Sequence, residues 1–346
     1  MSNPVNLIDI ADVHWQLATP EGRTDSYPDA LRAKLNEIFD LAARYKAIGI
    51  LVNGDLFNTP SVSLAAIGLL AQILTTAPCT VYAIAGQHDE WDHNPDSLGR
   101  TPFGLLAAAG LIRDVAANPV IIDLPWTSRH ANHAAWLEIS GRHYNHQADA
   151  EGYYEPPHIE GRSLILPDVR LMLSHGMLLD HEPSIDLKHT LVSELQSSAE
   201  VVCVGDYHPG VGIKRFDRGA LPPGLVVSPG ALARMKASPE EFERPVQAAV
   251  LTIDEDDVYA KLIPLECARP GCEVLSREHL ERQAQREERM EHFLGLLSAE
   301  GETRFLETRE IVDDIAKLEK VPAGVVAEAL LRIGRAREQL ARGVAV

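Results

Sequence analysis

Apolar and polar residues alternate in blocks along the N-terminal third of the chain, and these blocks predict strands and helices in turn. Three apolar runs have the length of buried strands: residues 5–10, 48–52 and 81–85. Residues 29–47 repeat apolar side chains at helical spacing, and Ser61 or Ser63 can cap a second helix that ends near Leu74. This order predicts a mostly parallel sheet with right-handed crossovers.

The pattern changes after a short helix expected at residues 103–109. Seven more runs have the character of strands: residues 120–124, 134–140, 170–174, 201–205, 225–228, 246–253 and 258–263. We expect them to build a second sheet packed on the first, which makes the fold class α/β. From about Ser276 onward Glu and Arg alternate with apolar residues, and helices are expected at residues 306–319 and 324–341.

Two domains follow from these patterns. Residues 1–268 are expected to form the main domain, with a small β-rich capping portion near residues 236–268, and residues 269–346 a helical tail. Hydrophobic content of 45% and charged content of 24% are ordinary for a globular protein. Since no apolar run reaches the ~20 residues of a membrane span and no export signal begins the chain, we expect a cytoplasmic protein without membrane contact.

Five of the apolar runs end in polar residues: Asp12-Val13-His14, Gly54-Asp55, Gly86-Gln87-His88-Asp89, Ser174-His175-Gly176 and Gly205-Asp206-Tyr207-His208. In open α/β sheets, ligands bind beyond the carboxyl ends of the strands. Carboxylates, imidazoles and amide oxygens suit a divalent metal ion. Each of these strand ends has an ordinary explanation when taken singly, but five at one edge predict a metal site.

The order of these residues resembles that of the calcineurin-like metallophosphoesterases, whose motifs run Asp-x-His, Gly-Asp-x-x, Gly-Asn-His-Asp/Glu, His and Gly-His-x-His. Gly54-Asp55-Leu56-Phe57-Asn58 is similar to the form found in DNA-repair nucleases of the SbcD type, the nuclease partners of a long coiled-coil ATPase. Residues 139–144 and 228–232 resemble further landmarks of that group. The resemblance covers residues 5–235 and implies a two-sheet αββα sandwich, the metallophosphoesterase fold, with a C-terminal helical appendage.

The same resemblance implies a pair of divalent metal ions. It assigns these ligands: Asp12, His14 and His208 to one ion, Gln87, His175 and Asp206 to the other, and Asp55 as a bridge between both. Two such ions activate a hydroxide for in-line attack on a phosphodiester. The family role of His88 is to protonate the leaving oxygen or to hold the phosphate, and we expect Asp89 to fix its tautomer.

Two positions depart from the family pattern, and both belong to the same ion. Gln87 stands where the family has Asn, and Asp206 where it has His. Three carboxylates around two ions favour a hard ion, so we expect Mn²⁺, with Mg²⁺ as the other candidate, over zinc. The alternative is a weak or empty second site. We expect activity to be retained, because His88, His175 and the other ligands are present and Asp is itself a competent ligand.

The first hypothesis for function is a metal-dependent DNA nuclease of the SbcD type that acts with an SbcC-like ATPase in DNA repair or recombination. Its C-terminal helices would dock on the ATPase coiled coil, although they could also pack on their own domain or form a homodimer. The net charge of −18 favours the alternative of a stand-alone metallophosphoesterase on nucleotides or small phosphoesters. A degenerate, inactive scaffold is the third hypothesis, supported by Gln87 and Asp206.

Several remaining residues near these motifs have ordinary explanations. Five histidines lie in loop-rich sequence, where a solvated or hydrogen-bonded role is expected: His130, His133, His143, His146 and His158. Trp15 and Trp91 flank the predicted site and could stack on a base or ribose, with plain packing as an equal alternative.

Overall fold

The computed structural model describes residues 4–128, 133–157, 167–278 and 319–341, together with residues 289, 312 and 315–317. The chain divides into two compact units, Met1–Arg277 and Glu278–Val346, which are described separately. The division into a catalytic domain of residues 1–268 and a partner-binding tail of residues 269–346 stays a prediction.

The helices and strands alternate in the first third of the chain, and strands dominate after it. The α-helices of the first unit are α1 (Tyr27–Arg44), α2 (Leu64–Leu74), α3 (Pro102–Ala108), α4 (Pro239–Glu243) and α5 (Gly271–Val274), and its 3-10 helices are η1 (Gln87–Asp89), η2 (Pro95–Arg100) and η3 (Val192–Glu194). The strands are β1 (Val5–Ile10), β2 (Gly49–Asn53), β3 (Thr80–Ile84), β4 (Arg113–Asp114), β5 (Val120–Thr127), β6 (Ala134–Gly141), β7 (Val169–Gly176), β8 (Leu178–Leu179), β9 (Thr190–Leu191), β10 (Val201–Asp206), β11 (Gly212–Phe216), β12 (Gly224–Ser228), β13 (Gln247–Ile253) and β14 (Val258–Pro264).

The strands form two six-stranded sheets and a two-stranded sheet of β8 and β9. The first has the order β14-β13-β1-β2-β3-β4 and the second the order β11-β12-β10-β7-β6-β5. The neighbours β1, β2, β3 and β4 are parallel, and so are β6, β7, β10 and β12. Because parallel neighbours end at the same edge of a sheet, the polar residues after β1, β2 and β3 share one edge, and those after β7 and β10 share another.

One prediction about the sheets was wrong. The strands expected at residues 246–253 and 258–263 do not join the second sheet: β13 lies beside β1 as an antiparallel neighbour, with Val5 opposite Ile253, and β14 pairs with β13. The central strand β1 therefore has partners on both sides. Pairing between the two ends of a long domain leaves no signal in local sequence patterns, so the order of the runs alone places these strands in the wrong sheet. The β-rich capping portion near residues 236–268 stays a prediction.

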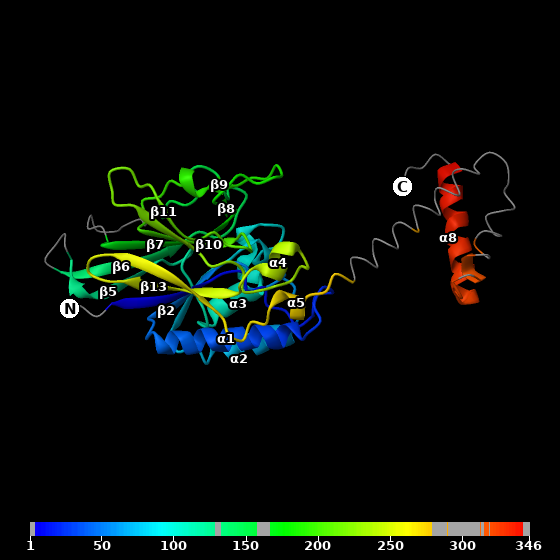
Figure 1. Ribbon diagram of the computed structural model, residues 1–346, viewed down its shortest axis with the longest axis horizontal. Coiled ribbons are helices and arrows are strands. Elements are labelled where there is room, and N and C mark those ends of the chain that lie inside the picture. Colours follow the sequence, from blue (N-terminus) through cyan, green and yellow to red (C-terminus); the bar gives the residue numbers. More distant parts are fainter. Residues whose placement is uncertain are drawn as a thin grey trace. The chain divides into compact units, whose positions relative to one another are not determined.

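The sheets and helices pack in layers around two main cores. Apolar side chains of α1, α2 and α3 pack on one face of the first sheet, and its other face packs on the second sheet through residues such as Leu51, Ile139 and Cys203. The outer face of the second sheet is covered by a segment that includes Tyr153 and Tyr154, with η3 beside it. Figure 1 shows α1 and α2 on one side of the two sheets and β8 and β9 on the other. The expected two-sheet sandwich is confirmed.

The second unit contains α8 (Ala323–Ala341), which confirms the helix expected at residues 324–341. Most of the helix expected at residues 306–319 lies outside the described residues. Among the residues that the structure describes, no helix combines the length and the apolar character that crossing a membrane requires.

Candidate metal centre

The residues after β1, β2 and β10 turn sharply where their strands end. Four of them have left-handed backbones: Asp12 (φ 52°), His14 (φ 47°), Asp55 (φ 49°) and Asp206 (φ 92°). Non-glycine residues rarely adopt this conformation, and they keep it only where the surrounding structure holds them. Three separate strand ends therefore carry backbone strain at the place where their polar side chains meet.

Asp12, His14 and His208 form what we call the first half of the centre. The Nε2 atoms of His14 and His208 lie 3.1 Å apart. The carboxylate of Asp12 completes the group, whose ligand atoms all lie within 4.8 Å of one another. Two ring nitrogens that face each other with a carboxylate nearby can share a proton or a metal cation.

Gln87, His175 and Asp206 form the second half. Nε2 of His175 lies 4.0 Å from Oδ1 of Asp206, and the side-chain amide of Gln87 donates a hydrogen bond of 2.7 Å to the same oxygen. His175 is fully buried, whereas Gln87 and Asp206 are partly exposed. The two residues that depart from the family pattern are thus in direct contact.

Asp55 lies between the two halves. Its Oδ2 atom is 3.6 Å from Nε2 of His14 in the first half and 3.4 Å from Nε2 of His175 in the second. Asp12 also has neighbours in both, since it groups with Asp55 and His175 as well as with His14 and His208. The position of Asp55 is the one expected of a bridging ligand, and the intermediate position of Asp12 was not predicted.

The orientation of His175 is fixed from behind. Its Nδ1 atom lies 2.6 Å from the carbonyl oxygen of Asn53, so Nδ1 carries a proton and Nε2 is the ring atom that faces Asp55 and could ligate a metal ion once deprotonated. Gly54 makes this approach possible: its φ is +88°, and a Cβ atom there would lie 2.2 Å from Nδ1 of His175. The strand end of β2 therefore sets both Asp55 and the ring of His175.

The donor atoms fit divalent metal ions. Nε2 of His175 and Oε1 of Gln87 are buried and have no hydrogen-bond partner among the described residues. A buried polar atom without a partner is costly, and a cation would satisfy both atoms. With Asp55 between them, the first half offers two nitrogens and two carboxylates, and the second half one nitrogen, two carboxylates and an amide oxygen.

The buried carboxylates at the centre also favour the binding of cations. Burial raises the pKa of Asp12 to about 6, although His175 and His208 act against this rise. Burial alone would raise the pKa of Asp55 too, but His175, His14 and His88 together hold it below its usual range. Two adjacent buried carboxylates are therefore ionised together only when positive charge lies beside them.

A family model described as calcineurin-like phosphoesterase matches residues 8–210 of the sequence, which is more than half of the chain. The chain belongs to the calcineurin-like phosphoesterase family. It is therefore a metal-dependent hydrolase of phosphoester bonds, and the grouped ligands described above support a dimetal site.

Solved structures similar to this phosphoesterase are distant. A dimetal phosphatase from Danio rerio is 12% identical over 76% of this chain and 97% of that chain, with a TM-score of 0.44. A hypothetical protein from Pyrococcus horikoshii OT3 is 14% identical over 93% of this chain and 96% of that chain, with a TM-score of 0.35. No curated protein matches the sequence.

His88 of this phosphoesterase lies beside Asp55 at the open side of the centre. Its backbone N–H donates to Oδ1 of Asp55 at 2.9 Å, and one of its ring nitrogens lies within 4.8 Å of ligand atoms of His14 and Asp55. The ring is exposed, and its Nδ1 atom lies 2.9 Å from the carbonyl oxygen of Asn58. A carbonyl accepts only, so Asn58 keeps a proton on Nδ1.

The role predicted for Asp89 was wrong. Its carboxylate does not fix the tautomer of His88; it accepts backbone hydrogen bonds from Leu56 and Phe57 at 3.0 and 2.8 Å and from Gly86 at 3.0 Å. Asp89 is completely buried, and η1 turns its side chain inward while the ring of His88 faces out. Asp89 therefore joins the loop after β2 to the loop after β3, and the carbonyl of Asn58 holds the histidine ring.

Sequence reasoning missed the residues behind His208. Oε1 of Glu241 lies 3.8 Å from Nδ1 of His208, and Arg244 donates from Nε and from a terminal nitrogen to Glu241, both at 2.9 Å. Burial alone would lower the pKa of His208, but Glu241 and Asp12 raise it above its usual value. The 32 residues between His208 and Glu241 leave no local signal for this pair.

The segment at residues 228–232 anchors the backbone of the first half. The N–H of Leu232 donates to the carbonyl of Ala11 at 2.9 Å, and that of Ala233 to the carbonyl of Asp12 at 3.0 Å. Buried Lys34 in turn donates to the carbonyl of Leu232 at 2.7 Å. This landmark was found by resemblance alone, and its contacts give it a physical role, which is to hold the strand end that carries Asp12.

The tryptophans and remaining histidines behave differently from one another. Trp15 is fully buried and its Nε1 donates to the carbonyl of Ala66, so it packs in the core and cannot stack on a substrate. Trp91 is 46% exposed and stays a candidate. The expected hydrogen-bonded role is confirmed for His143, whose Nδ1 accepts from the N–H of Ala85. His130 and His158 lie outside the described residues.

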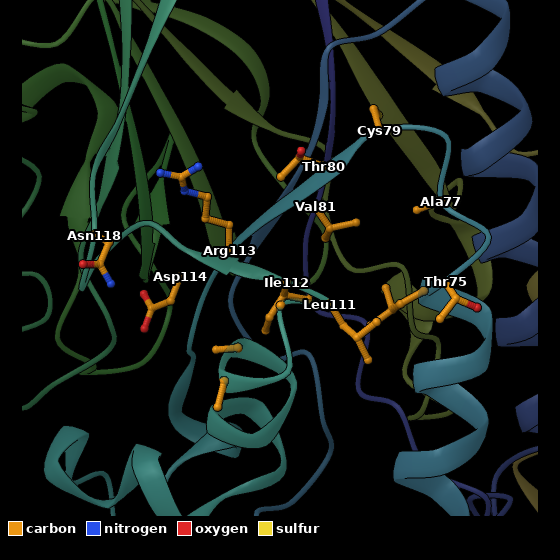
Figure 2. A pocket seen from close by; sticks show the side chains of 14 residues that line it. Thr75, Ala77, Cys79, Thr80, Val81, Leu111, Ile112, Arg113, Asp114 and Asn118 are labelled. Carbon is orange, nitrogen blue, oxygen red and sulfur yellow. The ribbon is translucent and has the colours of Figure 1, made fainter.

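A pocket of about 940 Å³ lies at the other end of β3. Cys79 and Thr80 line it where the strand begins, and Figure 2 shows Arg113 and Asp114 toward one end and Thr75 toward the other. None of the nine predicted site residues lines this pocket, so it is separate from the metal centre.

Proposed function

We propose that this phosphoesterase hydrolyses phosphodiester bonds of DNA, as nucleases of the SbcD type do. The observation that carries the proposal is the segment from Gly54 to Asn58. Its amides at Leu56 and Phe57 bind Asp89, and its last carbonyl holds the ring of His88. The residues that resemble the nuclease form of the motif are therefore those that position the histidine beside the centre.

In this proposal Asp12, His14 and His208 would hold one metal ion and Gln87, His175 and Asp206 the other, with Asp55 placed between them. The carboxylates favour Mn²⁺, with Mg²⁺ as the alternative. When bound, the ions supply an activated water nucleophile and neutralise the charge that builds up on the phosphate.

His88 supplies the proton for the leaving oxygen. Because the carbonyl of Asn58 retains the proton on Nδ1, the proton that is transferred comes from Nε2. The hydrogen bond from the His88 amide to Asp55 fixes the backbone of this donor beside the residue that lies between the two halves. The cytoplasm is the compartment we propose for this reaction.

The second unit is proposed to dock on the coiled coil of an SbcC-like ATPase. Val325 and Leu331 of α8 are 56% and 48% exposed. A groove of about 580 Å³ between α8 and the residues before it is lined by Val321 and Leu330 together with Lys317 and Lys320. Exposed apolar side chains on a helix beside a partly apolar groove support a contact with another helix. The alternative partner for this surface is a second copy of the chain, which would make a homodimer.

Two other functions have some support. The net charge of −18 favours a stand-alone phosphoesterase that acts on nucleotides or small esters. The hydrogen bond between Gln87 and Asp206 favours a degenerate scaffold, because these two residues satisfy each other in part. An active enzyme is favoured because the chain retains His88, His175 and Asp55.

The test uses the full chain loaded with Mn²⁺, linear duplex DNA and a chromogenic phosphodiester, with and without the partner ATPase. We expect DNA to be degraded and His88→Ala to lower turnover by about 10²–10⁴-fold with metal content intact. His181→Ala, at an exposed histidine, is the matched control. Rapid turnover of the small ester without DNA degradation, even with the ATPase present, would contradict the proposal.

A further inference from the structure

Three aromatic rings run in sequence from the metal centre to the surface. The ring of Tyr144 meets that of His175 edge-on with centroids 6.2 Å apart, and the ring of His93 meets Tyr144 in the same manner at 5.7 Å. His175 is buried, Tyr144 is partly buried and His93 is exposed. The row therefore begins at a predicted metal ligand and ends in solvent.

Both outer rings are rigidly mounted. The N–H of Tyr144 donates to the carbonyl of Ala85 at 3.0 Å, at the end of the strand that leads to Gln87 and His88. Asp92 and His93 both have left-handed backbones, with φ of 50° and 56°. Consecutive strained residues persist only when the surrounding structure holds them.

The loop that contains the strained residues has the bonds needed to hold them. The N–H of Trp91 donates to the hydroxyl of Ser97 at 2.9 Å, and the N–H of Asn94 donates to the carbonyl of Trp91 at 3.0 Å. This closed turn holds Trp91 and His93 close in sequence to η1, which carries Gln87 and His88. Trp91 is 46% exposed, so its ring is open to solvent and can contact a ligand.

Glu90 gives a second and independent sign that a ligand belongs here. It is 2% exposed, and neither of its carboxylate oxygens has a hydrogen-bond partner among the described residues. It lies between Asp89 and Trp91 in the sequence, so it begins the loop that carries Trp91 and His93. A buried carboxyl group without a partner is unusual in a folded protein and indicates a missing polar group.

We propose that Trp91, His93 and Tyr144 form an aromatic wall that stacks on the nucleobase next to the phosphodiester under attack. This inference rests on the proposed DNA nuclease function. Flat aromatic side chains receive bases of any sequence, because every base has a π-face. Bases inside a duplex are stacked on one another, so the wall selects a strand whose base is already unstacked, as at a frayed end or in a single strand.

The first experiment measures cleavage of an oligonucleotide and of its copy with an abasic residue beside the cleaved bond. We expect Tyr144→Leu to raise KM for the normal strand by roughly 5- to 100-fold with kcat little changed. For the wild type, we expect a higher KM for the abasic strand than for the normal strand. Tyr144→Leu should not raise the KM for the abasic strand further. Tyr144→Phe restores stacking and KM. Tyr259→Leu, at a tyrosine 46% exposed on β14, is the matched control.

The second experiment measures binding without turnover, by fluorescence anisotropy of the labelled oligonucleotide in the presence of a chelator. Weaker binding of the normal strand by Tyr144→Leu, but not of the abasic strand, supports the wall. Equal losses on both strands, or none on either, would overturn it. If the wild type cleaves no DNA at all, the proposed function fails; if it cleaves both strands equally well, only the wall fails.

Discussion

The two halves of the metal centre differ in the donor atoms that they offer. The first half presents the ring nitrogens of His14 and His208 with the carboxylate of Asp12, whereas the second presents one ring nitrogen with a carboxylate and an amide. Nitrogen-rich sites suit zinc and related ions, and oxygen-rich sites suit manganese and magnesium. The two neighbouring halves, with Asp55 between them, therefore offer donor atoms of unequal hardness.

The halves differ also in the groups that contact their histidine ligands from the side away from the centre. For His208 this group is Glu241, which forms an ion pair with Arg244 at 2.9 Å. Behind His175 stands the carbonyl of Asn53, whose side chain donates to the fully buried Asp9 at 2.8 Å. Charged support raises the basicity of a ligand more than a neutral carbonyl does. On this ground the first half should bind Mn²⁺ more tightly than the second, although the oxygen-rich donors of the second half act in the opposite direction for this ion.

The largest effect is expected from Asp55→Ala, which removes the contact shared by both halves. Affinity for both ions should fall by more than the roughly 10- to 100-fold that the loss of an outer partner costs, and turnover should disappear with them. Metal content measured by mass spectrometry checks this. His14→Ala and His175→Ala should each affect one ion, and a loss of only one ion in Asp55→Ala would mean that Asp55 is not shared.

Glu241→Gln comes next and acts on the first half alone. The ion held with His14 and His208 should bind about 10- to 100-fold more weakly, while the second ion keeps its affinity. Calorimetric titration of Mn²⁺ into the metal-free protein measures both. Glu240→Gln changes the exposed neighbouring glutamate and is the control. Equal weakening of the two ions would show that Glu241 supports the fold and not one half.

The second half is tested by Gln87→Asn, Asp206→His and the double variant. Gln87 is longer by a methylene than the Asn of the family pattern, and Asp206 is shorter than the His of that pattern. The longer side chain therefore compensates for the shorter one across their hydrogen bond. Each single change breaks the 2.7 Å hydrogen bond, and we expect a coupling of about 0.5–3 kcal/mol in the affinity for the second ion. The double variant should gain affinity for zinc. Additive effects would mean that the two residues act independently.

The smallest effect on the metals is expected from Asp9→Asn, which acts on stability instead. Burial raises the pKa of Asp9 to about 8, so the folded protein keeps a proton that the unfolded chain releases above about pH 4. Stability of the wild type should fall as the pH rises from about 4 to 8. Asp9→Asn should remove this slope and raise the free energy of unfolding at pH 7 by about 1–3 kcal/mol.

Thermal unfolding of metal-free protein across this pH range is the measurement for Asp9. Asp40→Asn, at an exposed position on α1, should leave the slope in place. An unchanged slope in Asp9→Asn would show that Asp9 is ionised in the folded protein.

The sequence alone was sufficient to predict most of the centre, because parallel strands deliver their ends to one edge and each motif residue lies at the end of a strand or shortly after it. It was insufficient where contacts depend on turns or on distant segments. A 3-10 turn sends Asp89 inward although it adjoins His88, and burial of Trp15 depends on its bond to Ala66. The ion pair behind His208 is formed by a short helix that no periodicity indicated, at Glu241.

Calorimetric titration of the metal-free wild type with Mn²⁺, combined with metal content per chain, tests the central claim most directly. We expect two ions per chain bound in two distinguishable steps, of which His14→Ala removes the tighter and His175→Ala the weaker. A single ion per chain at saturating Mn²⁺, or two ions bound with equal affinity, would contradict it.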